Sequence, residues 1–220
     1  MDIGVYVFLR DFSTLFIGLL SPIIGSIYFY KYKDSVLKYF LAYLWISVIL
    51  DYGAYIAREY FDIGNNGIVY NIFFFFSFIY LSSLYYRILR DPKKKKAVYA
   101  FIFVYIISFI VGGFYENYMT DFQSIPFITA SILFVLQAAL YFIEILNSKR
   151  ILYIKKNLFF WISIGILVYY VGNIPFRIAI KYYLEKESTT ILFSLLYVLI
   201  ILTHICYMIG FIWSDKKQQY

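Results

Sequence analysis

Residues 87–96 read Arg-Ile-Leu-Arg-Asp-Pro-Lys-Lys-Lys-Lys and separate two apolar stretches, near 68–89 and 97–114. Each stretch is about the length that a helix needs to cross a bilayer, roughly 17–25 predominantly apolar residues. Pro92 ends the first helix, because the residue before a proline disfavours helical backbone. Loops rich in Lys and Arg stay in the cytoplasm. The segment therefore predicts a cytoplasmic turn between two membrane-spanning helices.

The same alternation of apolar stretches and short polar connectors extends along the whole chain. The 220 residues are 63% hydrophobic, with a mean hydropathy of +0.74, and soluble domains are closer to half apolar. We expect an all-α membrane protein, a bundle of seven transmembrane helices that forms a single integral membrane domain over residues 1–220. The expected spans lie near residues 12–30, 37–57, 68–89, 97–114, 125–146, 158–178 and 190–213.

Every second connector is basic, and fifteen of the twenty Lys and Arg residues fall on one side of this zigzag. The asymmetry predicts an amino terminus outside and a carboxyl terminus in the cytoplasm. The net charge of +7 lies at the cytoplasmic rims of helices, which favours anionic lipid headgroups over nucleic acid as the partner. The cations of the cytoplasmic side are Lys31, Lys33, Lys38, Arg87, Arg90, Lys93 to Lys96, Lys149, Arg150, Lys155, Lys156, Lys216 and Lys217.

Two acidic residues, Asp51 and Glu144, fall inside apolar stretches. A charged side chain at bilayer depth costs about 2.5–3.5 kcal/mol on insertion scales and is a functional-site hypothesis by default. Small residues also recur at helix-packing spacing, and they let helix backbones approach closely in lipid. These are Gly18, Ser21 and Gly25 in the first span and Gly165 and Gly172 in the sixth.

The predicted topology places several polar residues at comparable depth in the outer half of the membrane. Tyr169, Asn173 and Arg177 are spaced i, i+4, i+8, so they share one helix face. We expect an outward-opening polar pocket in which Asp51 pairs with Arg177 or Arg58. The alternative is a structural ion pair or an arginine that extends to the interface. The residues expected to bind a ligand are Asp51, Arg58, Asn71, Tyr169, Asn173 and Arg177.

Glu144 and His204 are a possible proton relay near the cytoplasmic side. The alternative for Glu144 is charge balance with Lys149 or Arg150 at the interface. The alternative for His204 is a hydrogen-bonded packing residue.

Residue types argue against several chemistries of seven-span proteins. The seventh span has no lysine for a retinal Schiff base. His204 is the single histidine and Cys206 the single cysteine, so we expect no metal site and no cofactor. An intramembrane aspartyl protease needs two buried aspartates, whereas Asp51 is the one buried candidate. No catalytic residue is predicted, and enzyme is the weakest class.

Three segments carry a resemblance: 68–76 (Ile-Val-Tyr-Asn-Ile-Phe-Phe-Phe-Phe), 161–173 and 207–213. Their order resembles a family of small, largely uncharacterised bacterial seven-helix membrane proteins. The resemblance implies seven helices and a bacterial cytoplasmic (inner) membrane, and it carries over no catalytic residue and no ligand.

The sequence is compatible with three functional hypotheses. The first is a receptor-like sensor that binds a small ligand in the outer-half pocket and signals through a separate cytoplasmic or membrane protein partner, by a shift of a sixth helix kinked at Pro175. The second is a small-solute or ion transporter or channel subunit, and the third is an accessory membrane subunit or effector with a soluble partner.

Overall fold

The structure is a computed structural model that describes residues 3–61, 67–182 and 189–218, and these residues contain helices and no strand. Seven helical spans in this part of the chain are long and apolar enough to cross a membrane. The chain is therefore an all-helical, multi-pass protein with membrane-spanning character. The spans are Val7–Ile27, Lys38–Phe61, Gly67–Ile88, Pro92–Gly112, Ser124–Leu146, Leu158–Ala179 and Leu192–Trp213.

The described helices fall into two compact units. Unit 1 comprises Met1–Ile56 and Leu152–Tyr220, and unit 2 comprises Ala57–Ile151. The expectation of a single domain over residues 1–220 stays a prediction. The major elements are α1 (Ile3–Asp11), η1 (Phe12–Ile17), α2 (Gly18–Ile27), α3 (Lys38–Phe61), α4 (Gly67–Ile88), α5 (Pro92–Gly112), α6 (Ser124–Leu146), α7 (Leu158–Tyr182) and α8 (Thr189–Trp213).

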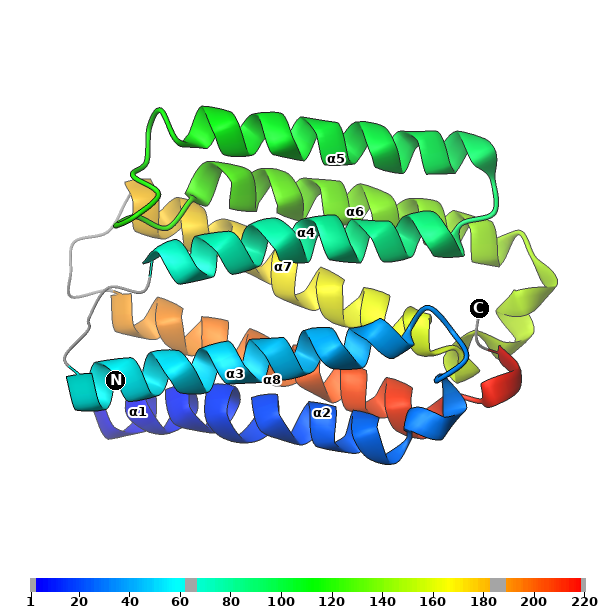
Figure 1. Ribbon diagram of the computed structural model, residues 1–220, viewed down its shortest axis with the longest axis horizontal. Helices are drawn as coiled ribbons and strands as arrows, with labels where there is room; N and C mark the ends of the chain where they lie inside the picture. The colour runs from blue at the N-terminus through cyan, green and yellow to red at the C-terminus, as the bar shows by residue number, and fades with distance from the viewer. Residues whose placement is uncertain (1–2, 62–66, 183–188, 219–220) are drawn as a thin grey trace. The chain divides into compact units, whose positions relative to one another are not determined.

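In unit 1, α8 packs against α7 and against the run formed by α1, η1 and α2 (Figure 1). Glycines permit the closest approach of α7 to α8. A Cβ atom added at Gly165 would lie 2.5 Å from a ring carbon of Tyr207, and one added at Gly172 would lie 2.6 Å from Leu199. The expected small-residue stripe of the sixth span is thus a packing surface between two helices.

The turn after α2 is attached to the end of α8. The Lys31 ammonium donates to the carbonyl oxygens of Phe211 (3.3 Å) and Ile212 (2.7 Å). These carbonyls belong to the last turn of α8, where a cation is favourable. Burial lowers the pKa of Lys31, and the charge of Asp215 opposes that shift.

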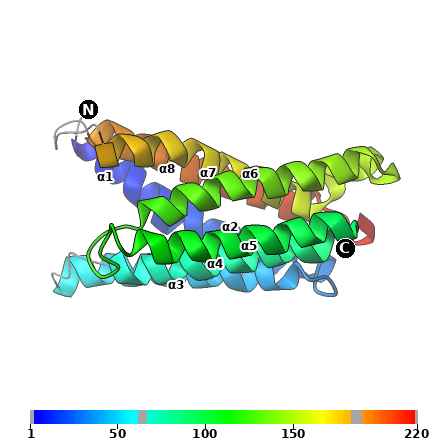
Figure 2. The ribbon, with the colours of Figure 1, turned by 90° about the horizontal axis from the view of Figure 1, so that it is seen from above.

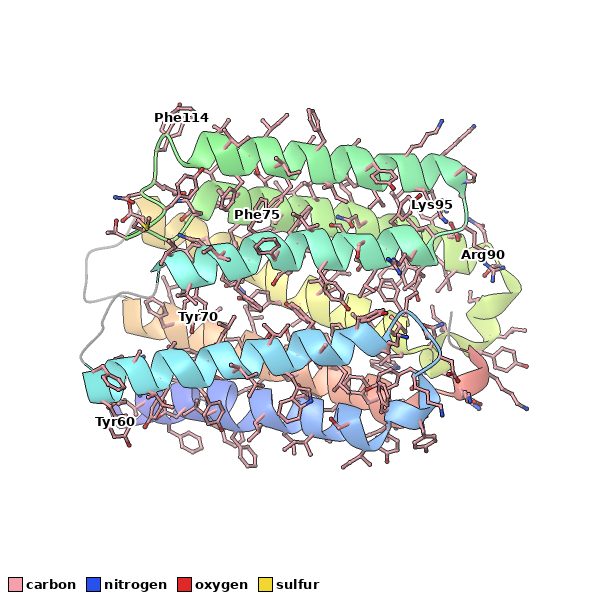
Figure 3. The ribbon with its side chains drawn as sticks, in the orientation of Figure 1. Tyr60, Tyr70, Phe75, Arg90, Lys95 and Phe114 are labelled. Atoms are coloured by element: carbon pink, nitrogen blue, oxygen red, sulfur yellow. The ribbon has the colours of Figure 1, made fainter. Side chains whose placement is uncertain are left out.

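In unit 2, α4, α5 and α6 run side by side (Figures 1 and 2). Aromatic side chains fill the space between them. The ring centroid of Phe78 lies 3.9 Å from that of Tyr105 and 4.8 Å from that of Phe134. The ring centroid of Phe75, which is labelled in Figure 3, lies 4.7 Å from that of Phe109. Phe78, which is fully buried, therefore lies in a core between the three helices, whereas Phe76 of the phenylalanine run is 63% exposed.

The start of α5 corrects one predicted boundary. The expected span began at residue 97, with the lysine run in the loop, but the helix begins at Pro92 and includes Lys93 to Lys96. Asp91 caps this helix by accepting a hydrogen bond from the Lys93 amide at 2.8 Å. Pro92 occupies the first helical position, where its missing N–H costs nothing. The lysines therefore form the first turn of a helix.

Candidate functional site

Tyr169, Asn173 and Arg177 follow one another at one-turn intervals on α7, which stays helical through Pro175. Asn173 is fully buried. Its Nδ2 donates to the Tyr169 carbonyl oxygen at 2.7 Å, while its Oδ1 accepts no hydrogen bond from any described residue. The Arg177 guanidinium carbon lies 5.2 Å from the centre of the Phe176 ring. The predicted polar face therefore exists on α7 and includes a buried acceptor.

Asp51 of α3 belongs to the same neighbourhood in unit 1. The charges of Arg177 and Asp51 both act on the Tyr169 hydroxyl, together with the hydroxyl of Tyr43. The fold thus brings Asp51, Tyr169 and Arg177 near one another, although they come from two helices far apart in the sequence. Direct pairing of Asp51 with Arg177 stays a prediction.

Arg58 lies at the end of α3, and its place in the expected pocket stays a prediction. It lies in the last turn of α3, with 43% of its side chain exposed, and its Nε is 3.5 Å from Glu59 Oε1. A pair as exposed as this contributes little to stability. The described geometry of Arg58 is that of a helix-end arginine at the surface.

Asn71 of α4 is almost fully buried and uses its amide to hold the connector between α5 and α6. Its Nδ2 donates to the carbonyl oxygens of Tyr118 (2.9 Å) and Asp121 (2.8 Å). Its Oδ1 accepts from the Gln123 amide at 3.1 Å. All three contacts are to backbone, so the described role of Asn71 is to position that connector.

Glu144 of α6 also binds a connector. Its carboxylate accepts from the backbone amides of Arg90 (2.8 Å) and Asp91 (3.4 Å) and lies 3.5 Å from Lys94 Nζ. Its described ion pair is therefore with Lys94, and the side chains of Lys149 and Arg150, the partners considered above, lie outside the described residues. The carboxylate joins the carboxyl-terminal part of α6 to the turn that precedes α5.

His204 of α8 contacts the first span. Its Nδ1 lies 2.7 Å from the hydroxyl oxygen of Ser21, which is fully buried, and its ring packs edge-on to Tyr207 at 5.8 Å. This is the hydrogen-bonded packing arrangement considered above. The relay from Glu144 to His204 stays a prediction.

Two residues near these groups were not predicted as members of the site. The sequence marks Ser21 only as a small packing residue, and it marks Tyr43 as one of 26 tyrosines. Nothing local pairs Ser21 with a residue of the last helix or Tyr43 with the sixth span. Tyr43 lies two turns before Asp51 on the same side of the second span. This spacing is the one feature of the sequence that indicates Tyr43 as a neighbour of the site.

The described residues contain no group of three or more His, Cys, Asp and Glu side chains placed to hold a metal ion. Comparison of the chain with protein-family models, curated proteins and solved structures found no match.

Proposed function

We propose that this chain is a receptor-like sensor of the bacterial cytoplasmic membrane, which binds a small polar ligand on the α7 face and signals through a separate cytoplasmic partner. The observation that carries the proposal is the buried, unpartnered Oδ1 of Asn173 between Tyr169 and Arg177. A buried acceptor without a donor costs about 1–3 kcal/mol. A ligand that donates to this oxygen recovers that free energy.

The charges around Asn173 define the class of ligand. Arg177 supplies a guanidinium one turn along the helix, which suits a carboxylate or another oxyanion. Asp51 supplies a carboxylate that acts on Tyr169 from α3, which suits an ammonium or hydroxyl group. We therefore propose a small zwitterion, such as an amino acid, or a small hydroxy acid.

The signal is a ligand-dependent shift of α7. Pro175 removes one backbone donor within this helix, and the site residues Asn173 and Arg177 lie on either side of it. A ligand that binds one arrangement of α7 more tightly shifts the population toward that arrangement. With the amino terminus outside and the carboxyl terminus in the cytoplasm, the partner reads the shift at the basic connectors.

Thermal unfolding of the full-length protein in lipid nanodiscs tests the binding step. The probes are the common L-amino acids and small 2-hydroxy acids at millimolar concentration. A compound present at 100 times its Kd stabilises the folded state by about 2.7 kcal/mol, so we expect at least one to raise Tm. Asn173→Leu and Arg177→Gln abolish that increase, whereas Gln137→Leu, which alters a buried amide of unit 2, preserves it. No increase with any probe contradicts the proposed ligand class.

Transport is the competing function, since an ionisable group in an apolar helix also serves as a coupling group. Proteoliposomes loaded with buffer distinguish the two functions. A sensor binds the stabilising compound without accumulating it. Uptake that depends on a proton or sodium gradient and disappears in Asp51→Asn would replace the sensor assignment with transport.

A further inference from the structure

The junction of α4 and α5 in unit 2 carries a concentration of cations that exceeds the acids beside it. Figure 3 shows the labelled Arg90 and Lys95 at this end of the unit. Both nearby carboxylates are already engaged. Glu144 binds two backbone amides and Lys94, and Asp91 caps α5. Five cations therefore lack a carboxylate within 4 Å among the described residues: Arg87, Arg90, Lys93, Lys95 and Lys96.

Two tyrosines, Tyr86 of α4 and Tyr99 of α5, lie next to this basic cluster. Lys95 Nζ lies 5.2 Å from the centre of the Tyr86 ring, and the rings of Tyr86 and Tyr99 are 4.6 Å apart. Tyr99 is 58% exposed. A tyrosine exposed between a cationic cluster and an apolar surface is typical of the membrane interface.

An exposed apolar stripe continues from Tyr99 along α5. Phe103 (65%), Ile107 (44%) and Ile110 (57%) are all exposed, and their spacing places them on one side of the helix. At about 1.5 Å per residue, the stripe from Tyr99 to Ile110 is about 16 Å long, close to half of the roughly 30 Å hydrocarbon core of a bilayer. The surface thus has cations at one end, followed by an apolar stripe about as long as one leaflet of the hydrocarbon core is thick.

We propose that the α4–α5 junction is a binding site for an anionic phospholipid. The headgroup phosphate lies among Lys93, Lys95 and Lys96, and an acyl chain lies along Phe103, Ile107 and Ile110. Charge complementarity requires an anionic headgroup, because the cluster has more cations than its own carboxylates neutralise. The adjoining apolar stripe requires acyl chains, which a free phosphate ion lacks. All residues of this site belong to unit 2, and none of them is a residue of the ligand site proposed on α7.

Native mass spectrometry of the full-length protein, titrated with dioleoyl phosphatidylglycerol or dioleoyl phosphatidylcholine, tests the proposal. We expect tighter binding of phosphatidylglycerol. Each neutralised cation reduces affinity about fivefold, so the triple variant K93Q/K95Q/K96Q binds phosphatidylglycerol roughly a hundredfold more weakly. The matched control K155Q/K156Q/K217Q removes three exposed lysines of unit 1, and we expect its affinity within twofold of the wild type.

Two additional measurements complete the test. Inorganic phosphate distinguishes a lipid site from a general anion site, because phosphate at the same concentration should not displace phosphatidylglycerol. If the triple variant does not fold, the single variant K96Q, at an exposed position, should show the fivefold loss. Equal binding of the two lipids, an equal loss in the control, or displacement by phosphate would each overturn the proposal.

Discussion

The hydroxyl oxygen of Ser21 lies 2.7 Å from Nδ1 of His204, so the first and last spans are joined by a side-chain hydrogen bond inside unit 1. Ser21 is fully buried. Loss of one partner leaves the other without this side-chain hydrogen bond, at a cost of about 1–3 kcal/mol.

We therefore expect Ser21→Ala to lower the free energy of unfolding by about 1–3 kcal/mol, measured by denaturant titration in bicelles. Ser108→Ala is the control, because Ser108 contacts only a carbonyl of its own helix and should change stability by less than about 0.5 kcal/mol. A double-mutant cycle with His204→Phe should give non-additive losses. Strict additivity would argue against an interaction between the two side chains.

Close packing of α7 on α8 predicts that Gly165 does not tolerate even a methyl group. Gly165→Ala places a Cβ 2.5 Å from the Tyr207 ring and 3.2 Å from the Thr203 carbonyl oxygen. We expect a destabilisation of about 1–3 kcal/mol from this overpacking. Partial recovery in Gly165→Ala/Tyr207→Leu would identify the ring as the cause.

Gly53→Ala is the opposite case in the same unit. A Cβ at Gly53 meets no atom within 4 Å, and alanine is preferred over glycine inside a helix by about 0.5–1 kcal/mol. We expect a small rise in Tm by thermal unfolding. A loss comparable to that of Gly165→Ala would show that backbone position, rather than close contact, determines the effect.

Because Lys31 donates to carbonyl oxygens at the end of α8, we expect its positive charge to stabilise the folded protein. Lys31→Met removes donors to the carbonyls of Phe211 and Ile212, and we expect a loss of about 0.3–1 kcal/mol that shrinks in high salt. Lys33→Met changes the same charge at an exposed position two residues away. An equal loss in both variants would point to net charge instead of the contact.

Asn173→Leu separates a structural role from a ligand-binding role. The substitution removes the unpartnered Oδ1 but also the hydrogen bond from Nδ2 to Tyr169. Loss of an unsatisfied buried acceptor recovers about 1–3 kcal/mol, and loss of one hydrogen bond costs about 0.5–1.5 kcal/mol. The two changes oppose each other, so we expect the ligand-free Tm not to fall below that of the wild type. A large fall in the ligand-free Tm would assign Asn173 to the framework of α7.

The proposed orientation is tested by reporter fusions in living bacteria. A green fluorescent protein fused after Tyr220 should fluoresce, since its fold matures in the cytoplasm, and an alkaline phosphatase fused there should be inactive. The basic connectors supply the physical reason. A dark fluorescent fusion made at normal abundance would reverse the orientation and, with it, the outward position of the ligand site.

The sequence alone determined the helical class, the seven apolar spans and the polar face of Tyr169, Asn173 and Arg177. These properties follow from hydrophobicity and from a 3.6-residue period, and both are local. Two predicted starts differed by five residues. The fourth span begins at Pro92, because the cap at Asp91 and the proline at the first helical position made the lysine run helical. The first span begins at Val7, where residue 12 was expected.

The tertiary structure decided which side chains meet. Ser21 finds His204 at a separation of 183 residues, Glu144 binds the turn before α5, and Asn71 holds the connector after it. Each of these polar groups lies within an apolar helix where several neighbours were possible. Which neighbour is within hydrogen-bond distance depends on the rotation and depth of two packed helices, and no pattern within one helix specifies those.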